Sequence, residues 1–328
     1  MQNSRIQAFD IAKMIAIYAV IITHCAGIIG GMQDLRYFIE TFYLSMFFVI
    51  SGYVTNSSRQ NSLPVKIFIW EKFKRLIIPF ISIIIISLLI NLCISGSCDV
   101  KNIFVDDAKG GYWFIYVLFI FNLILCFKRK VIQYFNLNDF WGQIVLLFPW
   151  IIIIVLCYFL PANIVSFFSL SSCRRYYLFF IIGYLSKSYN IFYLINQSMI
   201  SRFILILGYI VSSSIFVCYI KEIDTNFDFA FWIVTNFLGS FFWLSFLVWS
   251  ENKINYSPLC LKIGQSSLGI YLYHYFLLIF ISIISLEINK YLYLFLSSTI
   301  VLLITFCFVY FINKNTWLSK YLLGNSKL

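Results

Sequence analysis

Charged side chains are scarce in this sequence, and long polar segments are missing. Only 11% of the 328 residues are charged, 62% are hydrophobic, and the mean hydropathy is +0.89. A soluble domain carries about 25% charged residues, so this composition excludes that class of protein. The longest polar connections cover residues 56–75 and 95–111. We therefore predict an all-α, polytopic integral membrane protein with a single domain over residues 1–328 and no appended soluble domain.

Metal-binding patterns are also missing. The nine cysteines include no CxxC pair and no spacing typical of a metal site, so we predict no bound metal. Most of them lie in apolar runs, where Cys behaves as a small hydrophobic residue. Cys98 and Cys173 fall in predicted outer loops and could form a disulfide in an oxidising compartment.

Long apolar runs make up most of the chain. Runs of about 17–25 residues can cross a bilayer, and we predict about ten transmembrane helices. Their approximate positions are residues 9–30, 38–55, 76–95, 112–127, 141–160, 175–187, 203–220, 229–249, 267–285 and 291–312. We expect the first run to be retained rather than cleaved, because it contains Lys13 and His24 and no small-x-small site follows before Asp34.

The net charge of +11 follows from this topology. With the N-terminus in the cytoplasm, most of the 24 basic residues but only a minority of the 13 acidic residues fall on the cytoplasmic side. This bias fits the positive-inside rule. We therefore predict that both termini are cytoplasmic and that the protein binds no nucleic acid.

The chain has only two histidines, His24 and His274, and both lie in apolar runs. Lys13 precedes His24 by eleven residues, which on an α-helix is within about 20° of the same direction and about 16 Å along the axis. Asp10 lies one turn before Lys13. Ionisable residues in hydrocarbon cost at least about 2.5–3.5 kcal/mol each, so they usually face a polar interior.

Each of these residues has two interpretations. His24 is either a buried, hydrogen-bonded histidine or a general base that takes a proton from a hydroxyl near pH 7. Lys13 either extends to the inner headgroups or pairs with Asp10 and presents positive charge to an anionic ligand. Asp10 also suits a helix N-terminus as a first-turn acid.

Basic residues precede the predicted span 76–95. Lys72 and Arg75 are three residues apart, and Lys74 lies between them. They either set the orientation of the span or hold the phosphates of cytoplasmic coenzyme A, since on an α-helix Lys72 and Arg75 share a face.

Further candidate residues lie at the ends of other predicted spans. Ser51-Gly52-Tyr53 lies at the inner end of the second span, where glycine permits close helix packing. Tyr112-Trp113 is either an interfacial aromatic belt or a platform for stacking a sugar. Tyr271 and His274 share a helical face, which suits an interhelical contact as well as catalysis. The adjacent pair Arg174-Arg175 lies on the predicted outer side and is a candidate for steering an anionic glycan.

Together these segments resemble the integral-membrane acyltransferase family three, which includes sugar O-acetyltransferases acting on O-antigen, capsule and exopolysaccharide. The motifs that carry the resemblance occur in order along the chain: Asp10-Ile11-Ala12-Lys13 through His24, Phe47-Phe48-Val49-Ile50-Ser51-Gly52-Tyr53, Lys72-Phe73-Lys74-Arg75-Leu76-Ile77-Ile78-Pro79-Phe80, Tyr112-Trp113-Phe114, Phe179-Phe180-Ile181-Ile182-Gly183-Tyr184 and Ser267-Leu268-Gly269-Ile270-Tyr271-Leu272-Tyr273-His274.

The resemblance implies a ten-helix fold in the bacterial inner (cytoplasmic) membrane, acetyl-CoA as cytoplasmic donor, and a glycan acceptor on the far side. His24 matches the family's essential first-helix histidine. Lys13 stands where many members have arginine, and Lys72 and Arg75 match its two-basic-residue motif with lysine in the first place. We expect no bound cofactor, with acetyl-CoA as a cosubstrate.

We accordingly predict an O-acetyltransferase that modifies a surface polysaccharide or its lipid-linked repeat unit. Transfer is either direct or through a transient acyl-histidine. Transfer of another acyl group such as succinyl is an alternative. A lipid-linked oligosaccharide flippase is a non-enzymatic alternative, which the lack of visible repeated halves disfavours. A polymerase would be expected to have a larger outer loop.

Overall fold

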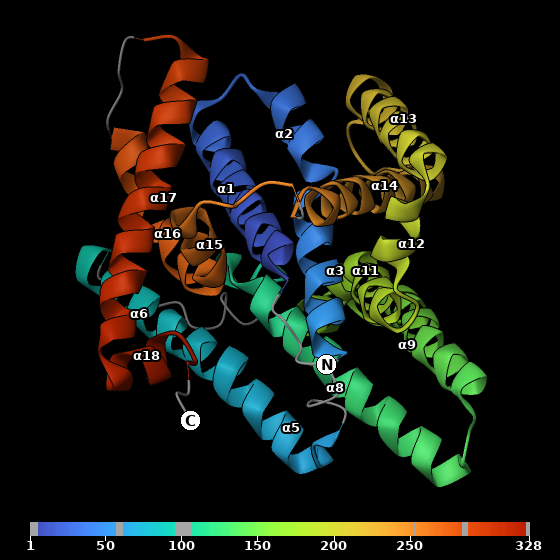
Figure 1. Ribbon diagram of the computed structural model, residues 1–328. Helices are drawn as coiled ribbons and strands as arrows, with labels where there is room; N and C mark the ends of the chain where they lie inside the picture. Colours follow the sequence, from blue (N-terminus) through green and yellow to red (C-terminus); the bar gives the residue numbers. More distant parts are fainter. Residues whose placement is uncertain (1–5, 57–61, 96–105, 252, 284–287, 326–328) are drawn as a thin grey trace. The chain divides into compact units, whose positions relative to one another are not determined.

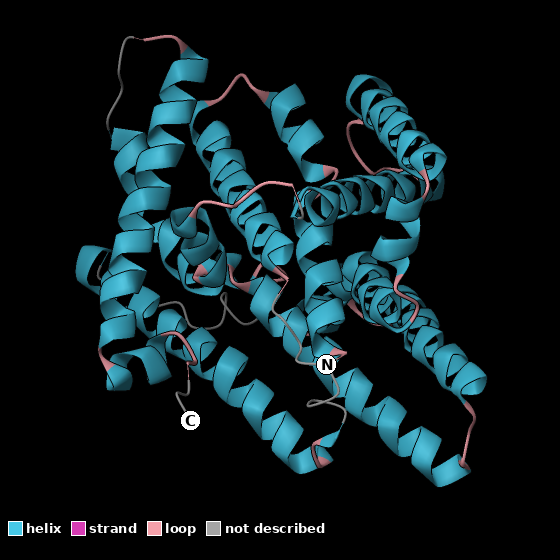
Figure 2. Ribbon diagram, viewed as in Figure 1, coloured by secondary structure: helices cyan, strands magenta, loops and turns pink. Residues whose placement is uncertain are grey.

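The structure, a computed structural model, describes residues 6–56, 62–95, 106–251, 253–283 and 288–325. These residues fold into helices joined by turns and short connections, and they include no strand (Figures 1 and 2). The all-α prediction is therefore confirmed.

The helices are α1 (Gln7–Ile29), α2 (Gln33–Glu40), α3 (Tyr43–Thr55), α5 (Val65–Lys72), α6 (Ile78–Ser95), α8 (Trp113–Phe135), α9 (Asp139–Phe159), α10 (Ala162–Phe167), α11 (Leu170–Ser188), α12 (Ile191–Gln197), α13 (Met199–Ile215), α14 (Asn226–Glu251), α15 (Pro258–Gln265), α16 (Ser267–Ile283), α17 (Lys290–Lys314) and α18 (Thr316–Leu322). Two π-helices, η1 (Phe73–Ile77) and η3 (Phe216–Ile220), and one 3-10 helix, η2 (Lys109–Gly111), complete the elements.

Seven helical stretches within the described residues are long and apolar enough to cross a membrane. They are Gln7–Ile29, Gln33–Thr55, Val65–Cys93, Trp141–Phe159, Met199–Ile220, Asn226–Glu251 and Lys290–Lys314. An eighth would be α11 with α12, which are bent by 72° at their junction.

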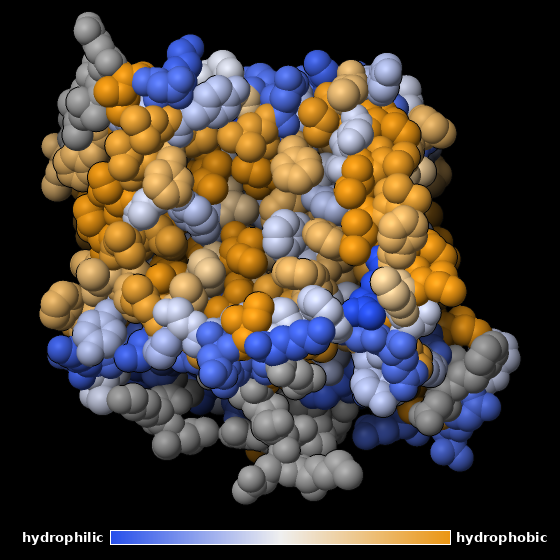
Figure 3. All heavy atoms as spheres, turned by 45° about the horizontal axis from the view of Figure 1, so that its top comes forward, coloured by the Kyte–Doolittle hydropathy of each residue, from blue (hydrophilic) through white to orange (hydrophobic). Residues whose placement is uncertain are grey.

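Each predicted span coincides with helical structure among the described residues. Apolar side chains make up most of the surface visible in Figure 3, as lipid-facing helices require. The protein is therefore a multi-pass membrane protein, while the count of ten spans and the orientation of the termini stay predictions.

The chain forms two compact units. Unit 1 comprises Met1–Tyr53 and Leu185–Phe311, and unit 2 comprises Val54–Tyr184 and Ile312–Leu328. Each unit is described separately below.

In unit 1, α1 packs against α14, α15 and α16. The approach of α15 to α1 depends on Gly264, because a Cβ at this position would overlap the carbonyl oxygen of Asp10. Glycine is therefore required where the two backbones meet, as is common between membrane helices. This contact fixes the first turn of α1, from which the stripe leading to His24 begins.

Polar side chains also join helices within unit 1. The Ser45 hydroxyl on α3 donates to the Asn236 Oδ1 on α14 at 2.9 Å, and the Ser240 hydroxyl donates to the Ser45 Oγ at 2.7 Å. All three residues are buried. Such bonds between membrane helices contribute about 0.6 kcal/mol on average.

In unit 2, the region predicted as a polar connection over residues 56–75 becomes helical at Val65. The helix then widens into η1, where the Ile78 N–H donates to the Phe73 carbonyl. Pro79 explains the change, because it has no N–H to donate to the Arg75 carbonyl and its ring would clash there in a regular α-helix. Lys74 and Arg75 therefore lie on a π-helix that follows Lys72, the last residue of α5, and the sequence did not predict this geometry.

The C-terminal segment of unit 2 packs on this same region. Helix α18 lies against α6, and the Ser82 hydroxyl donates to the Tyr321 carbonyl at 2.9 Å. Gly324 has φ +67°, and a Cβ there would overlap the Arg75 backbone. The tail thus covers the π-helix at the point where Pro79 alters the hydrogen bonding.

Candidate active site

The two histidines, separated by most of the sequence, meet inside unit 1. His24 lies on α1, five residues before the helix ends, and His274 lies on α16. Their ring centroids are 5.4 Å apart. His274 is fully buried, whereas His24 is half-buried. The packing of α1 against α16 therefore brings the only two imidazoles of the chain together.

Tyr275 completes what we call the histidine cluster, defined as His24, His274 and Tyr275. Its hydroxyl lies 3.0 Å from the His24 Nε2, and its ring centroid lies 4.7 Å from His24 and 4.5 Å from His274. The sequence analysis did not identify Tyr275, because its position next to His274 is the only feature of the sequence that points to it. The Tyr275 hydroxyl therefore lies within hydrogen-bond distance of the candidate base.

The protonation of His274 follows from its neighbours. Its Nδ1 lies 2.8 Å from the Tyr271 carbonyl oxygen and 3.2 Å from the Ile270 carbonyl oxygen. Carbonyl oxygens only accept hydrogen bonds, so Nδ1 carries the proton. The Nε2 is buried and has no hydrogen-bond partner among the described residues. Since a buried, unpartnered N–H is costly, we assign Nε2 as an unprotonated nitrogen with a free lone pair.

A cation also lies beside this cluster. Arg36, on α2, interacts electrostatically with His24. Its guanidinium lies 3.8 Å from the position that a Cβ on Gly27 would occupy, which places it over the last turns of α1. The sequence reading counted Arg36 only as an outer basic residue. A positive charge here is suited to an anionic group that approaches His24.

The predicted pair of Lys13 with Asp10 is present at the other end of the stripe. The Lys13 Nζ donates to the Asp10 Oδ1 at 2.7 Å, and the Gln265 Nε2 donates to the Asp10 Oδ2 at 3.2 Å. Asp10 is 2% exposed and Lys13 is half-buried. Because eleven residues separate Lys13 from His24 on one helix, about 16 Å of axial distance keeps Lys13 from contacting the imidazole.

The predicted donor residues fall in both units. Ser51, Gly52 and Tyr53 belong to unit 1, where the Tyr53 ring lies 4.7 Å from Phe9 and the Lys187 Nζ lies 5.3 Å from the Tyr53 ring. This environment is an aromatic cluster with one nearby cation.

Lys72, Lys74 and Arg75 belong to unit 2 and gain a further cation there. The Lys72 Nζ lies 5.1 Å from the Phe68 ring centroid, and the Arg129 guanidinium carbon lies 4.8 Å from the same ring. The sequence reading treated Arg129 only as a topology signal. We call Lys72, Lys74, Arg75 and Arg129 the basic cluster.

The π-helix changes how this cluster is arranged. The predicted common face of Lys72 and Arg75 assumed regular α-helical spacing, which η1 does not have. The Lys72 Nζ donates to the Thr55 hydroxyl at 3.4 Å, and Lys74 lies over the Trp70 ring at 5.8 Å. Arg75 is exposed. Arg129 lies beside the same Phe68 ring as Lys72, a neighbour that the spacing of residues along the sequence does not reveal.

The predicted acceptor residues Tyr112 and Trp113 lie at the start of α8 in unit 2. Tyr112 is 4% exposed, and Trp113 stacks on Tyr176 with ring centroids 5.3 Å apart. Tyr271, in unit 1, is 7% exposed and lies 5.9 Å from His274. Trp113 is the most accessible ring of these three.

Arg174 and Arg175 were expected on the outer side, at the start of a span over about residues 175–187, and α11 begins at Leu170. Both residues are therefore helical. The Arg174 carbonyl accepts a hydrogen bond from the Trp150 Nε1 at 3.0 Å, and Arg175 is exposed. Cys173 precedes them and is buried, while Cys98 lies outside the described residues.

A buried lysine organises the connection that precedes α8. The Lys109 Nζ donates to the Ser166 carbonyl at 2.7 Å and to the Asp106 carbonyl at 2.8 Å. Burial lowers the pKa of Lys109 and raises the pKa of Asp107 beside it. The sequence reading assigned no role to either residue, and their contacts indicate a structural one.

Comparison with known proteins identifies the family. The family model described as an acyltransferase domain matches residues 6–314. No curated protein and no solved structure gives a significant match to the chain. The matched region includes the whole histidine cluster and the whole basic cluster. The chain therefore belongs to acyltransferase family three and is a membrane acyltransferase.

Proposed function

We propose that the protein is an O-acetyltransferase of the bacterial inner membrane, which moves an acetyl group from cytoplasmic acetyl-CoA to a hydroxyl of a surface polysaccharide or its lipid-linked repeat unit. The observation that carries this proposal is the 3.0 Å contact between the His24 Nε2 and the Tyr275 hydroxyl inside an acyltransferase. It demonstrates that the first-helix imidazole meets an O–H group within unit 1.

His24 acts as the general base in this proposal. The acceptor hydroxyl gives its proton to the His24 Nε2 while its oxygen bonds to the carbonyl carbon of the thioester. Breaking the C–S bond then releases the coenzyme A thiolate, which takes up the proton. The Arg36 guanidinium is placed to offset negative charge that develops beside the imidazole.

The basic cluster supplies a site for the donor. Coenzyme A carries several phosphates, and Arg and Lys bind phosphate through charge-assisted hydrogen bonds. Lys72 and Arg129 both lie beside the Phe68 ring in unit 2, and Arg75, three residues after Lys72, is exposed. We propose that Lys74 contributes to the same site, while a role of Ser51, Gly52, Tyr53 and Lys13 of unit 1 in donor binding stays a prediction from the sequence.

The acceptor would be bound by aromatic and cationic side chains. Trp113 offers a partly exposed ring on which a sugar can stack, and Arg175 offers an exposed guanidinium for an anionic glycan. Tyr112 and Arg174 are the neighbouring acceptor candidates in unit 2, whereas Tyr271 and His274 are the candidates in unit 1, beside His24.

The first test is the chemistry of the surface glycan. Cells with and without the gene are compared by mass spectrometry and proton NMR of the purified polysaccharide. We expect the deletion to remove the mass of one acetyl group per repeat unit, together with an acetyl methyl signal that mild base also removes. A mass loss that corresponds to a succinyl group would show that the transferred group is succinyl rather than acetyl. A repeat unit of unchanged mass would contradict the proposal.

A second test concerns the base. The His24→Ala protein, checked for membrane insertion, should fail to restore the acetyl signal in the deletion strain. Normal acetylation by an inserted His24→Ala protein would contradict the mechanism while leaving the family assignment intact.

A further inference from the structure

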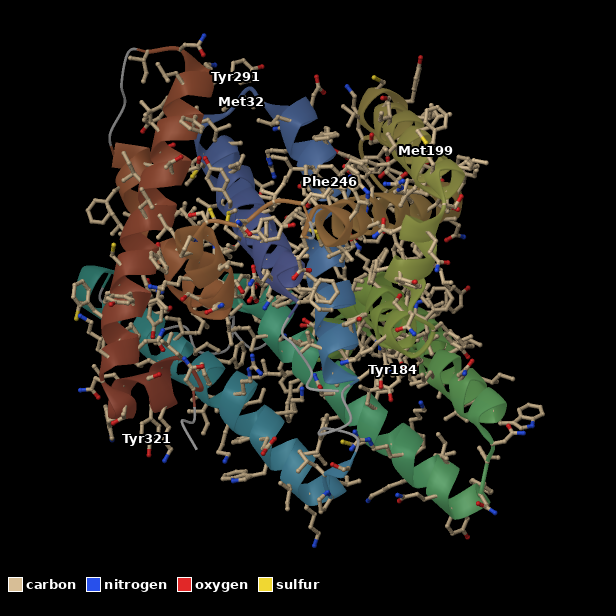
Figure 4. The ribbon with its side chains drawn as sticks, in the orientation of Figure 1. Met32, Tyr184, Met199, Phe246, Tyr291 and Tyr321 are labelled. Atoms are coloured by element: carbon tan, nitrogen blue, oxygen red, sulfur yellow. The ribbon has the colours of Figure 1, made fainter. Side chains whose placement is uncertain are left out.

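A groove with a volume of about 380 Å³ lies between α13 and α14 in unit 1. Its walls include Phe203 and Ile206 from α13, and Phe242 and Phe246 from α14. Residues 199, 202, 203 and 206 recur at helical spacing, as do residues 242, 245, 246 and 249, so each helix contributes one face. Figure 4 labels Met199 and Phe246, which come from opposite walls.

Trp249 lines one end of the groove together with Arg202, and a second cation, Lys253, lies against the Trp249 ring. The Arg202 guanidinium carbon lies 5.2 Å from the Trp249 ring centroid, and the Lys253 Nζ lies 4.0 Å from the same ring. Arg202 is in the first turn of α13, and Trp249 is in the last turn of α14. Charged residues and tryptophan at helix ends mark the boundary of a membrane, so the positive end of the groove lies at headgroup depth.

Two polar atoms of the groove are buried without a hydrogen-bond partner among the described residues. They are the Arg202 Nε and the Ser245 Oγ. Ser245 is 2% exposed. A buried donor without an acceptor is costly, so these atoms indicate that a ligand supplies the acceptor.

The nearest acid on α14 does not cancel this charge. Glu251 is two residues beyond Trp249, or about 200° around the helix, so it projects from the opposite side. Its Oε1 accepts a hydrogen bond from the Gln7 backbone N–H at 2.7 Å. The groove end therefore keeps a positive charge that favours an anion.

The chemistry changes in order along α14. Cations surround Trp249, a hydroxyl follows at Ser245 about 6 Å deeper, and aromatic hydrocarbon follows at Phe242 about 4.5 Å deeper still. An anionic glycerophospholipid has the same sequence of phosphate, ester and acyl chain. We propose that this groove binds one such lipid, with its phosphate between Arg202 and Lys253, an ester oxygen at Ser245, and one acyl chain between Phe203 and Phe246.

This site is independent of the proposed acetyl transfer. The full-length protein is purified in detergent and titrated with phosphatidylglycerol that carries bromine on its acyl chains, while tryptophan fluorescence is recorded. Brominated phosphatidylcholine, a brominated fatty acid and inorganic phosphate with unlabelled detergent are the comparison probes. We expect brominated phosphatidylglycerol to quench the tryptophan fluorescence saturably, and at a lower concentration than any other probe. The Trp249→Phe variant should lose this saturable quenching.

Three variants test the assignment of the cations. Arg202→Gln and Lys253→Gln should each weaken the apparent affinity for phosphatidylglycerol about five-fold, and Arg202→Lys should weaken it less. Lys221→Gln is the matched control, because Lys221 is an exposed cation that pairs with Asp34 at 3.8 Å outside the groove. It should leave the titration unchanged.

The outcomes are distinct. Equal quenching by phosphatidylcholine, or unchanged affinity in the Arg202→Gln, Lys253→Gln double variant, would overturn the proposal. Tighter binding of the fatty acid than of phosphatidylglycerol would also overturn the proposal, because it would show that the groove recognises a carboxylate rather than a phosphate. Quenching that Trp249→Phe does not reduce would place the bound lipid elsewhere.

Discussion

The histidine cluster of unit 1 and the basic cluster of unit 2 place ionisable side chains in apolar helices by different means. In the histidine cluster, His274 donates from Nδ1 to a backbone carbonyl and presents a bare Nε2, while His24 contacts the Tyr275 hydroxyl. In the basic cluster, the Lys72 Nζ and the Arg129 guanidinium carbon lie 5.1 Å and 4.8 Å from the centroid of the Phe68 ring. The first arrangement suits the movement of a proton, and the second suits the binding of a permanent anion.

The backbone features that position the two clusters also differ. A close glycine contact at Gly264 holds α15 against the first turn of α1. In unit 2, Pro79 produces the π-helix η1, and Gly324 lets the C-terminal segment approach Arg75. Positioning thus rests on tight helix packing in unit 1 and on a local change of helix geometry in unit 2. Altering each cluster separately should therefore separate turnover from donor binding.

The largest effect should come from His24→Gln, which keeps a polar side chain but removes the base. We expect the turnover number to fall by about 10²–10⁴-fold, because that is the usual contribution of general acid–base catalysis. The KM for acetyl-CoA should change little. Steady-state kinetics of the purified protein in lipid would measure both quantities. A turnover number within about three-fold of wild type would show that His24 is not the general base, so the two clusters would not differ in the way described above.

The next effect concerns the packing that supports α1. Gly264→Ala should destabilise the protein by about 1–3 kcal/mol, because the new methyl group would overlap the Asp10 carbonyl and force the backbones apart. Gly208→Ala is the matched control, since a Cβ there meets only the Leu238 side chain at 3.6 Å. Thermal unfolding in detergent would compare the two. Equal stability of both variants would show that α15 can move away from α1 without cost.

The basic cluster should respond through KM instead. Arg129→Gln should raise the KM for acetyl-CoA about ten-fold and leave the turnover number nearly unchanged, since a lost charge-assisted hydrogen bond costs about 1.5 kcal/mol. Lys130→Gln, which alters the adjacent exposed cation, is the control and should behave as wild type. If both variants raised KM equally, the effect would be one of general surface charge.

The smallest effect should come from Tyr275→Phe, which removes one hydroxyl from the histidine cluster. We expect about a five-fold lower turnover number, because the hydrogen bond to the His24 Nε2 contributes about 1 kcal/mol. The pH dependence of turnover, recorded beside wild type, would show whether Tyr275 acts through His24. A shifted profile would support that role, whereas an unshifted profile with full activity would make the hydroxyl dispensable.

Hydropathy and charge along the chain were enough to predict the helical membrane fold, and the six ordered motifs were enough to predict the family. The pair of Lys13 with Asp10 was also predicted, because both residues lie on one helix three positions apart. The predicted span 175–187 starts five residues later than α11, which begins at Leu170, because the polar residues around Arg174 and Arg175 weaken the hydropathy signal there.

Contacts between segments that are distant in the sequence could not be predicted from hydropathy, charge and motif order. Tyr275 and Arg36 join His24 only because α16 and α2 lie against α1, and Arg129 joins Lys72 only because α8 lies against α5. The sequence by itself determined which segments are apolar helices and which side chains in them are ionisable, because hydropathy and helical spacing are local properties. Only the tertiary structure decided which of those side chains meet, because that depends on which helix faces pack together.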